Sequence, residues 1–262
     1  MSVLSELSSR RVSLIASAIS RPMGIVSLVG IAVLVYLGLV LTPDDQIQGE
    51  LVRLIYIHPA MASATYLAFG ICALASALYL FPRTRNSLWD QLAAASAEVG
   101  VVFCGLTLLT GSIWGRPTWG VWWTWDARLT STAILFTLFL GYLALRRLPA
   151  DAEVKAKRTA IAALLAALNV PVVHYSVEWW RTLHQGRTLL FPEPTIHGIQ
   201  LVTMLLSFVV FTLVLVWLTI QRFRLDQMES EYESQAIDIA LEERRSEATT
   251  YAHESQRVEV QP

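Results

Sequence analysis

The stretch LIYIHPAMASATYLAFGICALASALYLF, residues 54–81, decides the fold class of this chain. It contains no Asp, Glu, Lys or Arg. A helix needs about 20 predominantly apolar residues to cross a hydrocarbon core of roughly 30 Å. Residues 54–81 are therefore predicted to form a transmembrane helix.

Five further stretches of the same kind lie on either side of this segment. They are residues 24–41, 92–113, 129–145, 159–177 and 195–221, and the only charged side chain within them is Glu98. The whole chain is 54% hydrophobic and 16% charged, whereas soluble domains carry about 25% charged residues. Barrel strands would show short alternating runs, which these stretches do not. The sequence predicts an all-α polytopic membrane protein with six transmembrane helices.

The basic residues predict the orientation of the six helices. With the N-terminus in the cytoplasm, 15 Lys and Arg residues fall in inner segments and 5 in outer ones, namely Arg53, Arg116, Arg128, Arg181 and Arg187. Cytoplasmic loops of membrane proteins carry the excess of positive charge. Both termini are therefore expected to be cytoplasmic.

The chain divides by composition into a membrane domain, residues 1–222, and a polar tail, residues 223–262. The tail is rich in Glu, Ser, Gln and Arg, so we expect it to be disordered or partly helical. No G-x-x-x-x-G-K-[ST] motif is present, and any ATP hydrolysis would belong to a partner subunit. Cys72 and Cys104 lie singly within spans and are interpreted as small apolar residues.

Tryptophan is concentrated in the outer segment WGRPTWGVWWTWDAR, residues 114–128. Five of the nine tryptophans lie there, and Trp179 and Trp180 fall in the next outer segment. An aromatic belt at the membrane surface explains one or two indoles per interface. The density in residues 114–128 favours instead a platform for a large planar ligand.

Four of the five histidines also map to the outer side: His58, His174, His184 and His197. Singly, each is more often a hydrogen-bonded interfacial residue than a ligand. Several imidazoles beside an aromatic surface favour heme, because neutral imidazole ligates heme iron. Zinc is the competing metal, but no H-x-x-H or H-E-x-x-H pattern is present.

Three of these sequence motifs resemble those of known membrane proteins. WGRPTWGVWWTWDARLT (residues 114–130) is similar to the "WWD" signature of heme-handling membrane proteins. The stretches NVPVVHYSVEWWRTLHQG (residues 169–186) and LIYIHPA (residues 54–60) resemble one branch of them, the cytochrome c maturation protein C or heme exporter protein C family. The resemblance covers nearly the whole membrane domain.

The resemblance implies a six-helix protein of the bacterial inner membrane that binds heme b at its periplasmic face and does not act as an enzyme. Its axial ligands would be His58 and His184, and the heme bed would be formed by Trp114, Trp119, Trp122, Trp123 and Trp125 with Asp126. The implied partners are a membrane-anchored heme chaperone, an ATP-binding subunit, a second membrane subunit and a small single-span subunit of an ABC-type assembly. The lipid bilayer surrounds the protein, and no nucleic acid partner is expected.

Outer arginines are the candidates for the heme propionates, because the guanidinium pairs with carboxylates through charge-assisted hydrogen bonds. Arg128 follows the tryptophan motif, and Arg53 precedes His58 by five residues. A pairing of Arg128 with Asp126, or contact with lipid headgroups, is nearly as good an interpretation.

Two other functions stay open from the sequence. A heme lyase of the wider WWD superfamily would attach heme to apocytochrome thiols, but such proteins are generally larger and lack the HYSVEWWRTLHQG pattern. A non-heme membrane scaffold would use the tryptophans only as anchors. Glu98 is interpreted as a structural residue near the inner end of its span.

Overall fold

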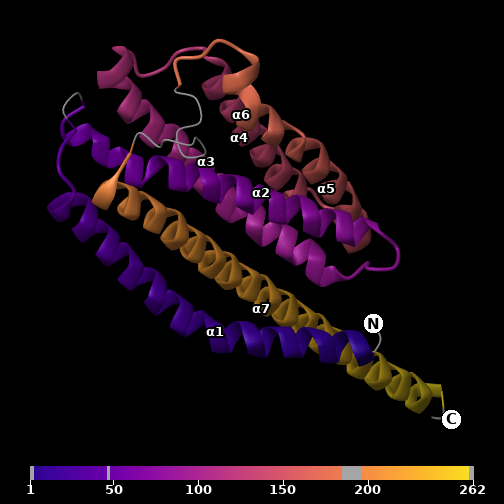
Figure 1. Ribbon diagram of the computed structural model, residues 1–262. Helices are drawn as coiled ribbons and strands as arrows, with labels where there is room; N and C mark the ends of the chain where they lie inside the picture. Colours follow the sequence, from indigo (N-terminus) through magenta and orange to yellow (C-terminus); the bar gives the residue numbers. More distant parts are fainter. Residues whose placement is uncertain (1–2, 46–47, 185–195, 260–262) are drawn as a thin grey trace. The chain divides into compact units, whose positions relative to one another are not determined.

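The computed structural model describes residues 3–45, 48–184 and 196–259. Within those ranges the chain is helical and has no strand, apart from an isolated bridge between Asp45 and Gly49. Figure 1 labels the seven α-helices, which are α1 (Val3–Tyr36), α2 (His58–Leu80), α3 (Ser87–Trp119), α4 (Ala127–Arg147), α5 (Ala152–Ala167), α6 (Asn169–Trp179) and α7 (Gly198–Glu259). Two short segments lie between α1 and α2, the π-helical η1 (Leu37–Leu41) and the 3₁₀ segment η2 (Glu50–Tyr56). The predicted fold class is confirmed.

Six helical segments in the described ranges are long and apolar enough to cross a membrane, as predicted. They are Ile15–Leu41, Glu50–Leu80, Ser87–Trp119, Ala127–Arg147, Ala152–Trp179 and Gly198–Glu247. The fifth differs from expectation because it consists of two helices, α5 and α6, that meet at Leu168. Pro171 explains the break, since it has no N–H for the Ala167 carbonyl and its ring crowds that carbonyl.

The chain forms two compact units, Met1–Phe223 and Arg224–Pro262. In the first unit the central core joins α2, α3, α4, α5 and α6, with the rings of Phe69 and Phe139 stacked at 3.6 Å between centroids. The first part of α7 packs on α2 and α3 through Leu215. The second unit is helical up to Glu259.

Helix α1 packs on α7 through small residues. A Cβ at Gly24 would come within 2.8 Å of the Trp217 ring, and one at Gly30 within 3.0 Å of Val210. The Ser20 hydroxyl donates to the Gln221 amide oxygen at 2.6 Å. Each glycine of α1 thus leaves space for a larger side chain of α7, in keeping with the small residues that line helix contacts in lipid.

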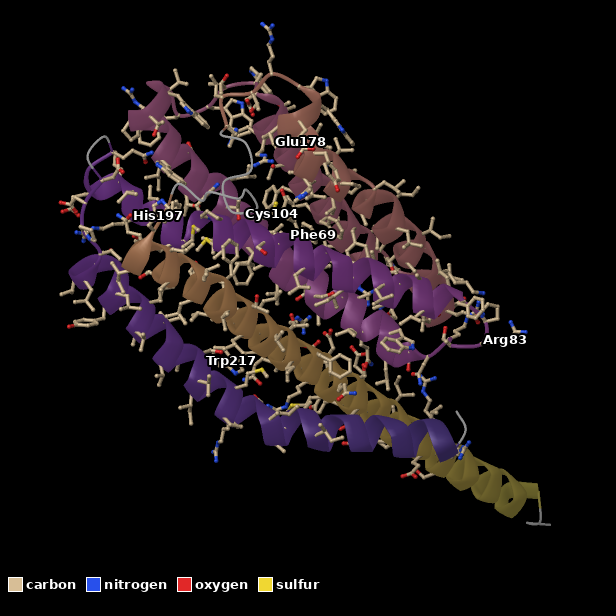
Figure 2. All side chains as sticks on the ribbon, viewed as in Figure 1. Phe69, Arg83, Cys104, Glu178, His197 and Trp217 are labelled. Carbon is tan, nitrogen blue, oxygen red and sulfur yellow. The ribbon has the colours of Figure 1, made fainter. Side chains whose placement is uncertain are left out.

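The first unit has two ends with different chemistry. We call the end where α2 and α4 begin, and α3 and α6 end, the tryptophan end; the opposite end, where α2 and α4 finish, is the arginine end. Figure 2 labels His197 and Arg83, which lie at opposite ends of the bundle.

Ion pairs hold the helices together toward the arginine end. Arg146 of α4 donates to both carboxylate oxygens of Asp90 on α3, at 2.7 and 3.0 Å. Glu98 accepts hydrogen bonds from the Arg222 guanidinium through both of its oxygens. Glu98 thus joins α3 to α7, which agrees with its interpretation as a structural residue.

Candidate functional site

His58 is the first residue of α2, and its ring is surrounded by residues of α3, including Thr107, whose backbone is a hydrogen-bond partner. Pro59 follows it in the first turn, where the missing N–H of proline costs no helical hydrogen bond. The His58 Nδ1 lies 3.1 Å from the Thr110 hydroxyl, and the ring meets Trp114 edge-on at 5.9 Å between centroids. A Cβ at Gly111 would come within 2.9 Å of His58 Cε1, so only glycine leaves room for this imidazole.

His184 is held by the carboxylate of Asp126. The His184 Nδ1 lies 3.1 Å from Asp126 Oδ1, and the ring packs edge-on against Trp119 at 4.8 Å between centroids. The second carboxylate oxygen accepts the Leu183 N–H at 2.8 Å and the Thr182 hydroxyl. The short segment 182–184 is therefore fixed in place by a single side chain.

Asp126 is also the N-cap of α4. Its Oδ1 accepts the backbone N–H groups of Arg128 at 2.8 Å and of Leu129 at 3.3 Å. These are donors that a helix start leaves without an intrahelical partner. Since its side chain is only 2% exposed, Asp126 positions other groups and does not offer a surface to a planar ligand.

Electrostatics favours an ionised Asp126 and a neutral His184. Burial raises the pKa of Asp126, but the hydrogen bonds from Thr182 and the Leu183 N–H lower it by more, so the net shift is downward. Burial lowers the pKa of His184, and the Asp126 carboxylate opposes that shift without reversing it. A neutral imidazole that donates from Nδ1 to a carboxylate has its Nε2 lone pair free to bind a metal.

The structure brings the two predicted ligands together. His58 and His184 come from segments far apart in the chain, yet each imidazole lies within electrostatic range of the other and of the Arg128 guanidinium. The other two outer histidines differ. The exposed His174 packs edge-on against Tyr66 and Tyr175, and His197 is exposed in front of α7.

The predicted tryptophan loop, residues 114–128, is only partly a loop. Helix α3 continues to Trp119, where Gly120 ends it with a φ of 80°, and α4 begins at Ala127. Trp114 and Trp119 are consequently half-buried on the last turns of α3, where they pack against the two histidines.

The other three tryptophans of the predicted bed lie in the segment 120–126. Trp122 is 59% and Trp125 is 81% exposed, and Trp123 packs edge-on against Trp125. The five predicted bed residues therefore form two groups, a half-buried pair that supports the imidazoles and an exposed group of three.

The two candidate arginines have different partners. Arg53 is engaged by Asp44 at 3.0 Å, Glu50 at 2.8 Å and the Leu39 carbonyl at 2.7 Å. Arg128 donates to the His174 carbonyl at 3.1 Å, and within the described part of the chain no carboxylate forms an ion pair with it. Asp126 binds the backbone N–H of Arg128 instead of its guanidinium. Arg187 lies outside the described residues.

Sequence reasoning missed the α3 residues that seat His58. The spacing of Thr107, Thr110, Gly111 and Trp114 places them on one helix face, at i, i+3, i+4 and i+7. That pattern was readable in the sequence, but nothing in it indicated which histidine the face meets. Thr182, whose hydroxyl links Asp126 to the His184 N–H, carries no sequence signal of its own.

Comparison with known proteins gives consistent matches. A family model described as heme exporter protein C matches residues 3–238, a range that includes every site residue named above. Heme exporter protein C of Haemophilus influenzae is 37% identical over 195 residues, which is 74% of this chain and 78% of the relative. The protein of the same name from Bradyrhizobium diazoefficiens is 40% identical over 185 residues, 70% of each chain. A putative cytochrome c biosynthesis ccmC-like mitochondrial protein of Marchantia polymorpha is 36% identical over 180 residues, 69% of this chain and 75% of the relative.

Proposed function

Because the chain belongs to the heme exporter protein C family, we propose that it binds heme at its tryptophan end and presents it to a membrane-anchored heme chaperone. It acts in heme transport and the maturation of c-type cytochromes, as the names of its relatives indicate. The observation that carries the proposal is the convergence of His58 and His184, each with Nδ1 engaged by a protein group.

The donor set of this end fits heme b as cargo. Two imidazoles with free Nε2 atoms are a suitable axial pair for heme iron, whereas a structural zinc site requires four ligands. Trp122, Trp123 and Trp125 offer exposed indole surface to a planar macrocycle. Arg128 is the better propionate partner, because Arg53 is already neutralised by two carboxylates.

The role of the chain is delivery and not catalysis. Heme supplies the reactive vinyl groups when it is bound, and the protein residues bind, orient and support it. ATP hydrolysis is assigned to an ATP-binding subunit, which works with a second membrane subunit and a small single-span subunit. In a bacterial inner membrane the tryptophan end faces the periplasm, and the arginine end and both termini face the cytoplasm.

A spectrum of the purified protein tests this function. Wild type should carry a Soret band with a bis-histidine signature, and His58→Ala or His184→Ala should lose most of the bound heme because each removes an iron bond. Added imidazole should restore binding by filling the gap. His174→Ala is the matched control, and loss of heme in that variant with retention in His184→Ala would overturn the ligand assignment.

The same preparation separates the alternatives. A scaffold without heme would show no Soret band. A heme lyase would need apocytochrome before any covalent product forms, whereas a delivery protein should load the chaperone covalently in its absence.

A further inference from the structure

The two imidazoles of the site have unlike partners, although each is held through Nδ1. His184 faces the Asp126 carboxylate at 3.1 Å, and His58 faces the Thr110 hydroxyl at the same distance. A ligand imidazole is commonly oriented by such a second group, whose identity tunes how strongly the ring donates to the metal. We therefore expect the two imidazoles to differ in how strongly they bind iron.

The direction of the hydrogen bond at His58 follows from the single proton of Thr110. That hydroxyl donates to the Leu106 carbonyl at 2.8 Å, within its own helix, and a carbonyl can only accept. The hydroxyl oxygen is then left to accept the Nδ1–H of His58. This tautomer leaves His58 Nε2 unprotonated and available to iron. The Asp126 carboxylate selects the same tautomer in His184, because it accepts the Nδ1–H.

The strength of the two interactions differs. An ionised carboxylate polarises the Nδ1–H bond and raises the basicity of Nε2, whereas an alcohol that has already donated its proton does so weakly. His184 is also held by its own backbone, since its N–H donates to Thr182 at 3.1 Å. His184 is accordingly the stronger donor and the more firmly held ring.

The seat on α3 keeps His58 in register with Thr110. Gly111 leaves space for the Cε1 edge of the ring, and Trp114 meets it edge-on one turn further along. A side chain at position 111 would push the imidazole off the hydroxyl, because its Cβ would lie 2.9 Å from Cε1. The arrangement holds the ring by shape and by neutral partners alone, the Thr110 hydroxyl and the Thr107 backbone.

We infer that Thr110 is a positioning residue that presents His58 as the weaker, exchangeable axial ligand of heme, while Asp126 makes His184 the firmer one. This inference rests on the proposed function and adds an order of release to it. When heme is handed over, His58 leaves the iron first, and the vacated position is the one offered to an incoming ligand.

Free imidazole is the probe that tests this order in the full-length protein loaded with hemin. Thr110→Val keeps the shape of the side chain and removes the hydroxyl. It should weaken heme binding about tenfold, the lower end of the effect of losing a partner that orients a metal ligand. It should also speed displacement of His58 by imidazole in stopped-flow spectra, whereas Thr110→Ser should behave as wild type.

Thr118→Val is the control, because Thr118 lies on the same helix and its exposed hydroxyl donates to the Trp114 carbonyl. Yield and dispersity of each purified variant show that it has folded. Imidazole exchange in Thr110→Val at the wild-type rate, or a Thr110→Ser protein that behaves like Thr110→Val, overturns the role of Thr110.

The identity of the departing ligand is read from the electron paramagnetic resonance of the imidazole adducts. The wild-type adduct should match that of His58→Ala with imidazole, since both hold His184 and a free imidazole. A match to His184→Ala with imidazole would reverse the order of release. Absence of heme in wild type, by contrast, would remove the proposed function itself.

Discussion

The two ends of the bundle use charge in opposite ways. At the arginine end three arginines bind groups of the protein: Arg146 pairs with Asp90, Arg158 donates to the Leu145 and Leu148 carbonyls that end α4, and Arg85 donates to the last carbonyls of α2. At the tryptophan end Arg128 donates to the His174 carbonyl and the Ser176 hydroxyl and has no carboxylate partner among the described residues, and two imidazoles are engaged through Nδ1. At the arginine end these groups stabilise the bundle, whereas Arg128 and the two imidazoles are the groups that we propose bind a ligand.

The difference teaches that position in the chain alone does not mark a functional residue. Asp90 and Asp126 are acids near the starts of helices, the first half-buried and the second buried, and each accepts more than one hydrogen bond. Asp90 pairs with Arg146, which also binds Thr159, whereas Asp126 holds His184 against the Trp119 ring. The partner decides the role.

The largest expected effect is all-or-none and concerns which end faces out. A cysteine introduced at the exposed Thr118 should react with an impermeant thiol reagent in intact cells. One at the exposed Ala152 of the arginine end should react only after the membrane is opened. We expect this result because membrane proteins carry their excess of basic residues on the cytoplasmic side, and the excess here is at the arginine end. Labelling of position 152 in intact cells would reverse the orientation and contradict a periplasmic site.

The next effect separates stability from binding. Arg146→Ala leaves the largely buried Asp90 without its partner and should lower the free energy of unfolding by up to about 3 kcal/mol. This is the lower end of the range for broken buried ion pairs, because both side chains keep some exposure. Thermal unfolding in detergent should therefore occur at a lower temperature, with heme affinity of the folded fraction unchanged. The exposed neighbour Arg147→Ala is the control and should unfold as wild type does.

Asp126→Ala should affect heme binding more than stability. Loss of the helix cap costs about 1 kcal/mol of stability, while loss of the group that orients His184 should weaken heme binding by about 10- to 100-fold. Titration of the apoprotein with hemin measures the affinity. If Arg146→Ala weakened binding as much as Asp126→Ala, the proposed division between the two ends would not hold.

The smallest effect tests the propionate partner. In wild type, heme dimethyl ester should bind several-fold more weakly than heme, because esterification removes the carboxylates that Arg128 would pair with. In Arg128→Ala the two ligands should bind almost equally. An equal penalty for the ester in both proteins would take Arg128 out of the site.

Much of the fold followed from the sequence because lipid imposes a strict rule: charge-free runs of about 20 residues must be helices. The family resemblance was likewise confirmed, since its motifs are long and specific. The break at Leu168 was missed even though Pro171 was visible, because hydropathy alone reads residues 159–177 as one run.

The site was less predictable, because its geometry depends on pairings between distant segments. The extension of α3 to Trp119 was hidden by Gly115 and Pro117, which resemble loop residues but are tolerated within the helix. The role of Asp126 as a shared anchor required knowing that residues 182–184 return to the start of α4. Its ligand roles stay predictions until heme binding is measured.

The pairing of α1 with α7 has a consequence for synthesis. The Ser20 hydroxyl bonds a side chain 201 residues later in the chain, and Gly24 packs against Trp217. At about 5–20 residues per second, the ribosome needs roughly 10–40 s to make the interval between these partners. During that time these residues of α1 have no α7 to pack against, so this pairing belongs to the last steps of assembly.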